Sequence, residues 1–438
     1  MKDINVGILG CGIVGTGVAK LLMENYALLK LRIGTGLNLK YVADLDTHTP
    51  RGITFKEGVF ISDASQVLND PDIDIVVELI GGKTIAQTFT LQALENKKHV
   101  VTANKALIAS HGNELVKTAT ANQVEYAFEA SCGGCMPVVK SIRESLVGNH
   151  IQSFTGILNG TCNYILTKIS KEGCLFEDAL KEAQAKGYAE ADPFLDVEGH
   201  DSAHKLAILA ALAYGMEINL ADIHVEGISQ ITPMDIEFAK EFGYCIKLLA
   251  ISKNEDDTVE ARVHPAMIPL DSPLAHVDKA MNAITIDGDA SGQTMLYGAG
   301  AGMLPTASAV ISDIVDIARN IISGCGQRVP ILSYPADNIK RIAIKPVSEI
   351  KTGYYIRLAA LDQPGVLSRV SGILADHGIS IKSVHQKGRR SNGTVPIVMI
   401  THIAREKDIQ DALSKISTLD SIPDNSIIIR IEDKQNDQ

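Results

Sequence analysis

A glycine-rich turn between an apolar strand and a helix constrains this chain more than any other feature. Residues 4–9 form a short apolar run typical of a buried parallel strand, and Gly10-x-Gly12-x-x-Gly15 follows and opens a helical run. Here the glycines permit a tight turn, close approach of a pyrophosphate and close helix–strand packing, while the helix N-terminus faces the anion. The pattern predicts a Rossmann-type dinucleotide-binding domain; a plain glycine-rich turn is the alternative.

Two acids and an arginine bear on the choice of dinucleotide. The segment 37–43 predicts a second strand that ends at Asp44, where an acid can accept hydrogen bonds from the adenosine ribose and favour NAD. Asp44 and Asp46 follow the glycines by about 30 residues, which is farther than the usual ~20. Arg51 could meet the 2′-phosphate of NADP if its loop folds back. The sequence therefore leaves NAD and NADP open.

Lys105 follows a later strand of the same sheet. The runs 73–80 and 99–102 predict strands, and Ala103-Asn104-Lys105 comes directly after the second one. Ligands bind beyond the carboxyl ends of strands in an open parallel sheet, so Lys105 is expected to face the nicotinamide side. A surface lysine that begins a helix is the alternative.

A carboxylate-rich stretch, 187–209, runs from a loop broken by glycine and proline into an apolar helix. Asp201 and Lys205 are four residues apart where the helix begins, so both side chains leave one face. An amine and several acids in one place suit a small zwitterionic substrate with a reacting carbonyl; an exposed helical ion pair is the alternative. The acids of this stretch are Glu190, Asp192, Asp196, Glu198 and Asp201.

Two further segments carry polar groups between strands and helices. Cys132 and Cys135 enclose two glycines, but no second Cys or His pair has zinc spacing, so a tight turn is favoured over a metal or redox centre. The carbonyls of that turn, with the carboxylate of Glu129, could hold a hard cation. Farther along, a strand at 151–158 leads into a helix at 164–172, and Thr161 and Asn163 suit helix capping.

The predicted domain organisation is α/β with four parts. Residues 1–130 form the dinucleotide-binding domain, completed by a helix within 303–325, and residues 131–302 form an α+β substrate domain. Further short strands are predicted at 125–130, 260–263 and 282–288, and a glycine-rich stretch at 297–302 leads into the helix. A proline-punctuated linker spans 326–350. Residues 351–435 give the order βαββαβ, with a turn at 390–393, which predicts a small split-βαβ module.

Length, charge and cysteine content limit the number of domains, the partners and the cellular compartment that we expect. The chain of 438 residues is long enough for two or three domains. A net charge of −11 and the lack of long basic runs argue against nucleic acid as a partner. No apolar run approaches the ~20 residues of a membrane span, and the first strand begins too early to leave room for a signal peptide. Seven scattered cysteines indicate a reducing compartment, so we expect a cytoplasmic protein.

Together these motifs resemble those of the homoserine dehydrogenase family, in its monofunctional form with a C-terminal ACT regulatory domain. The resemblance covers nearly the whole chain. The first of its motifs is shared by many dehydrogenases, whereas the third and fourth are close to exclusive to this family. In order, the motifs are GILGCGIVG, TANKALIA, LNGTCNYILT, GYAEADPFLDVEGHDSAHKLAIL and, for the ACT module, LDQPGVLSRVSGILADHGISI.

The resemblance implies the interconversion of L-aspartate 4-semialdehyde and L-homoserine by hydride transfer with NAD or NADP, in threonine and methionine biosynthesis. It implies that Lys205 gives a proton to the forming alcohol and that Lys105, near the nicotinamide and the substrate, assists catalysis. Asp201 and Glu190 match residues that hold the substrate. The implied cofactor contacts are Gly10, Gly12, Ile13, Val14, Gly15, Lys105, Gly187 and Gly302.

The resemblance also implies that the protein binds a cation, forms oligomers and is regulated by an amino acid. A sodium ion would be held by Glu129 and by backbone carbonyls of the loop that contains Cys132, Gly134 and Met136, and backbone ligation tolerates the cysteines. The family forms dimers through its central domain, so a homodimer or homotetramer is expected. The ACT module implies an amino-acid effector at the edge formed by 362–365 and 378–381, and threonine is the first hypothesis.

Two other classes of protein fit part of the pattern. A Rossmann–ACT dehydrogenase for a 2-hydroxy acid needs an Arg/His/acid set, for which His200 and His204 beside Asp201 are the only candidates. A non-catalytic sensor of amino acids and nucleotides would not need the pair Asp201 and Lys205.

Overall fold

The computed structural model describes residues 3–255, 257–386, 394–424 and 426–433, so the turn predicted at 390–393 lies outside the described residues. The chain forms two compact units. Unit 1 comprises Met1–Phe154, Ala203–Ala221 and Met281–Ile342, and unit 2 comprises Thr155–Ser202, Asp222–Ala280 and Ala343–Gln438.

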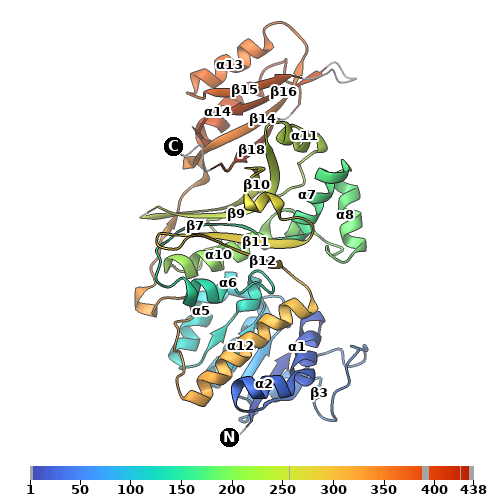
Figure 1. Ribbon diagram of the computed structural model, residues 1–438, viewed down its shortest axis with the longest axis vertical. Coiled ribbons are helices and arrows are strands. Elements are labelled where there is room, and N and C mark those ends of the chain that lie inside the picture. Colours follow the sequence, from blue (N-terminus) through green and yellow to red (C-terminus); the bar gives the residue numbers. More distant parts are fainter. Residues whose placement is uncertain (1–2, 256, 387–393, 425, 434–438) are drawn as a thin grey trace. The chain divides into compact units, whose positions relative to one another are not determined.

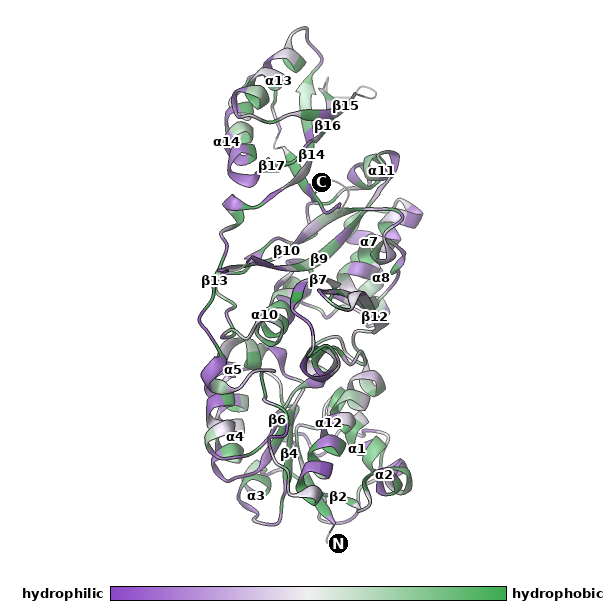
Figure 2. Cartoon of the chain, turned by 60° about the vertical axis from the view of Figure 1, so that its left-hand side comes forward, coloured by the Kyte–Doolittle hydropathy of each residue, from purple (hydrophilic) through white to green (hydrophobic). Residues whose placement is uncertain are grey.

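A six-stranded sheet forms the centre of unit 1 (Figure 1). The strand order is β3-β2-β1-β4-β5-β6, and all neighbours pair in parallel. The strands are apolar because helices cover both faces of a parallel sheet, and Figure 2 colours the central strands as hydrophobic. Their bounds are β1 (Ile4–Leu9), β2 (Leu37–Ala43), β3 (Phe60–Ile61), β4 (Ile75–Glu78), β5 (His99–Thr102) and β6 (Tyr126–Ala127).

Helices cover the two faces of this sheet (Figure 2). On one face are α1 (Ile13–Glu24), α2 (Tyr26–Ile33) and α12 (Met303–Ser323), and on the other are α3 (Ala64–Asn69), α4 (Thr84–Glu95) and α5 (Lys105–Ala121). Buried aliphatic residues of α12 and α1 share one core with β1 and β4. This core places the glycine loop at the carboxyl end of β1.

The rest of unit 1 contains shorter elements. Residues 125–130, predicted as a strand, give only the two-residue β6 and then a 3₁₀ turn (Glu129–Ser131). After it come α6 (Val138–Lys140), a π-helical turn (Ser141–Ser145) and most of α10 (His200–Tyr214). A hairpin of β11 (Met281–Gly288) and β12 (Gly292–Ala299) precedes α12, so the glycine-rich stretch at 297–302 begins as strand.

Unit 2 contains a mixed sheet. The long antiparallel hairpin of β9 (Tyr244–Glu255) and β10 (Thr258–Pro269) was largely missed by sequence, which predicted only 260–263 as strand. The C-terminal module has the predicted βαββαβ order, and its β18 pairs with β14 and also with β10. Its elements are β14 (Lys351–Leu361), α13 (Val366–Asp376), β15 (Ile381–Gln386), β16 (Thr394–Thr401), α14 (Glu406–Ile416) and β18 (Ile427–Ile431).

Short elements complete the two units. The segment that sequence singled out as acidic begins after α8 (Phe176–Ala185), contains the single turn α9 (Phe194–Val197) and ends in α10. Within the described residues, none of the helices combines the length and apolar character that crossing a bilayer requires. The remaining elements are β7 (Ile151–Ile157), α7 (Gly160–Glu172), β8 (His224–Val225), α11 (Pro233–Glu241), β13 (Ala343–Ile344), β17 (Ala404–Arg405) and three 3₁₀ turns at Pro273–His276, Ala336–Asn338 and Val347–Glu349.

Candidate active site

The glycine loop of unit 1 leaves open space at the start of α1. Gly10 has a φ of +94°, and a Cβ on Gly15 would lie 2.1 Å from the carbonyl oxygen of Gly10, so both positions need glycine. A Cβ on Gly12 would meet nothing within 4 Å. The neighbouring Ile13 side chain is 70% exposed, whereas Val14 is half-buried. The loop therefore fits an anion at the helix N-terminus, with a dinucleotide lying along it.

Asp44 and Arg51 fold against this loop. The Asp44 carboxylate accepts a hydrogen bond of 2.6 Å from the backbone N–H of Cys11, and Nε of Arg51 donates to the Cys11 carbonyl oxygen at 2.7 Å. Nη2 of Arg51 lies 3.6 Å from Oδ1 of Asp44. The loop thus folds back toward the glycines, which was the condition for Arg51 to meet a 2′-phosphate.

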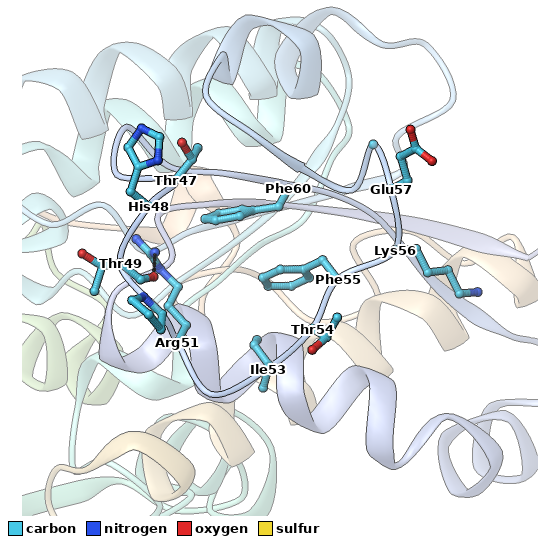
Figure 3. A pocket seen from close by; sticks show the side chains of 12 residues that line it. Thr47, His48, Thr49, Arg51, Ile53, Thr54, Phe55, Lys56, Glu57 and Phe60 are labelled. Carbon is cyan, nitrogen blue, oxygen red and sulfur yellow. Dashed lines mark hydrogen bonds between the residues drawn. The ribbon is translucent and has the colours of Figure 1, made fainter.

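The loop that carries Arg51 also surrounds a shallow pocket (Figure 3). Its wall is formed by residues 47–58 without Gly52, and by Phe60. The rings of Phe55 and Phe60 lie 5.0 Å apart, and the Arg51 guanidinium is 5.1 Å from the Phe60 ring. Arg51 therefore places a cationic group beside Asp44, which directly follows β2.

Lys105 begins α5 directly beyond the carboxyl end of β5 and is half-buried. The Asn104 side chain caps this helix and donates to the carbonyl oxygen of Gly82, at 2.8 Å. Below it, the Thr102 hydroxyl donates to the fully buried Glu78 carboxyl at 2.7 Å, and burial raises the pKa of Glu78. These bonds tie together the loops after β4 and β5, so Lys105 stands at the ligand-binding edge of the sheet.

The cysteine loop is a double-glycine turn. Gly133 and Gly134 have φ values of +77° and +61°, and a Cβ on Gly134 would lie 2.5 Å from the carbonyl oxygen of Ala299. Burial raises the pKa of Cys132 to about 12, and Cys135 is exposed; all seven cysteines are free. The pair is therefore poorly suited to supply the thiolates that zinc or disulfide chemistry requires.

Glu129 places a buried carboxylate beside this turn; its side chain accepts hydrogen bonds from the backbone N–H groups of Val139 (2.9 Å) and Lys140 (2.8 Å). Its own N–H donates to the buried Asp313, and burial, reinforced by the Asp313 charge, raises the pKa of Glu129 to about 7. Lone pairs remain on both oxygens, which suits a hard cation. Among the described residues no three His, Cys, Asp or Glu side chains gather as a metal cluster, so a cation here would rely on backbone oxygens such as that of Met136.

Asp201 and Lys205 lie one turn apart on α10, and each is only 7% exposed. Their interpretation as an exposed helical ion pair is therefore wrong. The Cys132 sulfur lies 3.9 Å from the carbonyl oxygen of Lys205, so the cysteine loop packs beside the helix that carries the lysine. A buried ammonium at this position needs an acidic or polar environment, which a functional site provides.

Asn159 was missed as a site residue by the sequence analysis. It caps α7, so the helix starts at Gly160 and the predicted caps, Thr161 and Asn163, are wrong. Nδ2 of Asn159 donates to the carboxylates of Asp196 (2.7 Å) and Asp201 (3.0 Å). Its place immediately before the helix and within the motif LNGTCNYILT could have marked it in the sequence.

Three other residues predicted to bind the cofactor or the substrate lie in loops next to helices. Gly187 follows α8 with a φ of +73°, and the side chain of Glu190 is exposed. Gly302 precedes α12 with a φ of +119°. Within unit 1 the structure therefore gathers the glycine loop and Asp44, and within unit 2 it gathers Asn159, Asp196 and Asp201.

Comparisons with known proteins show the family of this chain. Family models match at 10–129 ("Homoserine dehydrogenase, NAD binding domain"), 137–315 ("Homoserine dehydrogenase") and 354–420 ("ACT domain"). Proteins named homoserine dehydrogenase from Neisseria gonorrhoeae and Pseudomonas aeruginosa are 43% and 44% identical to this chain, and each alignment covers 99% of both chains. A crystal structure of a homoserine dehydrogenase from Thiobacillus denitrificans has a TM-score of 0.94 at 44% identity and 99% coverage of both chains.

The parallel sheet, its glycine loop and the dinucleotide-binding family match define an NAD(P)-dependent oxidoreductase. The buried Asp201 and Lys205 of α10 lie in the part of the chain that matches the "Homoserine dehydrogenase" family model. The chain belongs to the homoserine dehydrogenase family, in the form that carries a C-terminal ACT domain.

Proposed function

We propose that this protein interconverts L-aspartate 4-semialdehyde and L-homoserine with NAD(P), in the biosynthesis of threonine and methionine. The observation that carries the proposal is the buried pair Asp201 and Lys205 on one face of α10, in a chain of this family. The test is oxidation of NADH and NADPH by the purified protein with aspartate semialdehyde. Wild-type protein without turnover with either cofactor would overturn the proposal and favour the sensor interpretation.

Lys205 is the proposed proton donor. Bound NAD(P)H supplies the hydride to the aldehyde carbon. The carbonyl oxygen gains negative charge as the C–H bond forms, so the Lys205 ammonium stabilises the transition state and then gives its proton to that oxygen. Lys105 assists from the carboxyl edge of the parallel sheet, and Asp201 and Glu190 hold the amino end of the substrate.

Cofactor binding is assigned to the glycine loop with Ile13 and Val14, and to Lys105, Gly187 and Gly302. The open space at Gly12 supports this assignment for the pyrophosphate. Asp44 favours the ribose hydroxyls of NAD, whereas Arg51 adds a cation for a 2′-phosphate, so both cofactors should work. Arg51→Ala should lower kcat/KM for NADPH by about tenfold relative to NADH, since it removes one charge-assisted contact. An unchanged ratio would remove Arg51 from this role.

Glu129 and the carbonyls of the loop with Cys132, Gly134 and Met136 are the proposed sodium ligands. The buried Glu129 carboxylate and the left-handed turn at Gly133 and Gly134 support this assignment. Replacing choline chloride by sodium chloride at constant ionic strength should raise the melting temperature of the wild type. Glu129→Gln should not respond, and an equal response of both proteins would exclude the site.

Threonine is the proposed effector of the ACT domain, at the edge formed by 362–365 and 378–381. Ion pairs link this domain to the rest of unit 2. Arg430 of β18 contacts the partly exposed Glu226 at 2.8 Å, and Arg357 of β14 contacts the buried Asp235 of α11 at 2.6 Å. Titration of threonine into the assay tests the proposal, and a rate and oligomeric state that do not change would reject it.

The segment that holds Glu226 also touches the acidic loop. The backbone N–H of Ile228 donates to the carbonyl oxygen of Val197, and a Cβ on Gly227 would lie 2.5 Å from that same oxygen. This close contact offers a direct route from the ACT domain to Asp196 and Asp201 within unit 2.

A homodimer or homotetramer is proposed for the assembly. β12 is the last strand of its sheet, and its Tyr297 side chain is 58% exposed, so this edge could pair with a second copy. Light scattering of the purified protein tests the assembly, and a monomeric mass would reject it. The seven free cysteines support the cytoplasm as its compartment.

A further inference from the structure

The side chain of Asn159 lies where β7 leads into α7 and is only 4% exposed. Its Oδ1 accepts the backbone N–H of Cys162 at 2.8 Å, and its Nδ2 donates to Oδ1 of Asp196 and Oδ2 of Asp201. An amide group offers two N–H donors, and both are used here. The reversed amide orientation would leave a backbone N–H facing an amine and two carboxylates facing an oxygen, so the chemistry fixes this orientation.

The two carboxylates belong to different elements that Asn159 brings together. Asp196 lies in α9 and Asp201 in the first turn of α10, and Gly199, with a φ of +84°, makes the bend between them. Like charges this close repel each other, and an amide that donates to both offsets the repulsion without cancelling the negative charge. A lysine in the same place would neutralise the site that a substrate ammonium has to meet.

The first turn of α7 anchors the acidic loop at a further point. The Thr161 hydroxyl donates to the carbonyl oxygen of Tyr188 and lies 3.3 Å from the second oxygen of Asp196. The sulfur of Cys162 lies 3.1 Å from the carbonyl oxygen of Asp196. The start of α7 thus holds both ends of the segment from Tyr188 to Asp201.

We propose that Asn159 is a positioning residue, which orients the carboxylate of Asp201 for the amino end of the substrate by tying it, together with Asp196, to the start of α7. The proposal rests on the role of Asp201 in the proposed function. A structural alternative exists, because Asn159 also caps α7, so the test has to separate capping from orientation.

A serine at residue 159 retains the cap of α7 and removes the two amide donors. Asn159→Ser keeps an oxygen that caps well but reaches neither carboxylate. It should raise the KM for homoserine by about tenfold, the size of one charge-assisted hydrogen bond, with the KM for NAD(P) unchanged. Asp63→Ala is the control, since Asp63 caps α3 in unit 1 and this variant loses a helix cap without touching the acidic loop. It should lower the melting temperature with both KM values unchanged.

Asn159→Asp adds a pH signature that capping alone would not give. The new carboxyl would face the carboxylates of Asp196 and Asp201 and the backbone N–H of Cys162, and repulsion from the two carboxylates should raise its pKa. When protonated, it can donate one hydrogen bond again. Its kcat/KM for homoserine relative to wild type should therefore recover as the pH falls, whereas that of Asn159→Ser should not. This nearly isosteric variant also carries the test if the serine variant is insoluble.

The outcomes distinguish this proposal from the proposed function. A wild type that does not act on homoserine would overturn the function itself, and an Asp201→Asn variant with an unchanged KM would overturn the role of Asp201. An active wild type whose KM depends on Asp201 but not on Asn159, with no recovery of Asn159→Asp at low pH, would reduce Asn159 to a helix cap.

Discussion

The glycine loop at residues 10–15 and the acidic loop at residues 187–201, which we propose bind the cofactor and the substrate, offer different kinds of contact. The glycine loop offers backbone, open space at Gly12 and the N-terminus of α1. The acidic loop offers side chains, and two of them, Asp196 and Asp201, accept hydrogen bonds from Asn159. A site built from backbone groups loses affinity for its ligand when a side chain is added. A site built from side chains loses affinity when a charge or a hydrogen-bond donor is removed. Substitutions should therefore separate cofactor affinity from turnover.

Lys205→Ala should have the largest effect. Loss of a positioned proton donor lowers kcat by about 10²- to 10⁴-fold, while the glycine loop stays intact, so cofactor affinity should hardly change. Steady-state kinetics and the fluorescence of bound NADPH measure the two quantities. Comparable loss of both would mean that Lys205 supports the fold rather than the reaction.

Gly15→Ala and Gly12→Ala should separate packing from binding at the backbone site. A Cβ at residue 15 meets the Gly10 carbonyl oxygen, so this variant should lose about 1–3 kcal/mol of stability, as overpacking does. A Cβ at residue 12 has room in the protein, so that variant should keep its stability and bind the dinucleotide at least several-fold more weakly. Urea unfolding measures the stability of the two variants, and NADPH titration measures their cofactor affinity. Equal losses of stability would show that the two glycines do not differ in their packing.

Asp201→Asn should have an intermediate effect at the side-chain site. The change keeps the shape of the side chain but removes the charge proposed to bind the substrate amino group, so KM for homoserine should rise about tenfold and kcat should fall. The KM for NAD(P) serves as the internal reference. A KM for homoserine that stays at the wild-type value would assign Asp201 to helix structure alone.

Glu226→Gln should have the smallest effect and should depend on pH. Burial alone would raise the pKa of Glu226, but hydrogen bonds from His224 and Arg430 hold it well below its usual value. A lowered pKa means that the ionised form stabilises the fold above about pH 4.5 and that this contribution is lost as the pH falls. The free energy of unfolding of the variant should be lower by about 1 kcal/mol at pH 7. The effect is small because the Glu226 side chain is 37% exposed, so solvent screens its charge.

Urea unfolding at pH 7 and pH 3.5 checks this, because the difference in unfolding free energy between the variant and the wild type should be smaller at the lower pH. If the difference in unfolding free energy is the same at both pH values, the charge of Glu226 contributes nothing to stability. The same variant should also weaken any threonine response, since Arg430 loses its contact outside the ACT domain.

Much of the glycine-loop unit could be predicted from the sequence. The strand at Ile4–Leu9, the turn and the helix after it are set by neighbouring residues, so local patterns suffice. The hairpin of β9 and β10 was largely missed, because its strands are nearly continuously buried and carry no simple alternation. The start of α7 was misplaced by four residues, since Thr161 and Asn163 looked like caps and turned out to bind the carbonyl oxygens of Tyr188 and Val277.

The sequence by itself determined the classes of residue available to this protein: glycines after a strand, five acids before a helix, and a lysine four residues beyond the last acid. Only the tertiary structure decided which of these act together. It buried Asp201 and Lys205, folded Arg51 back onto the glycine loop and brought Asn159 to two carboxylates 37 and 42 residues away. The physical reason is that a local pattern fixes backbone conformation, whereas burial and hydrogen-bond partners depend on segments that are distant in sequence and meet only when the chain folds.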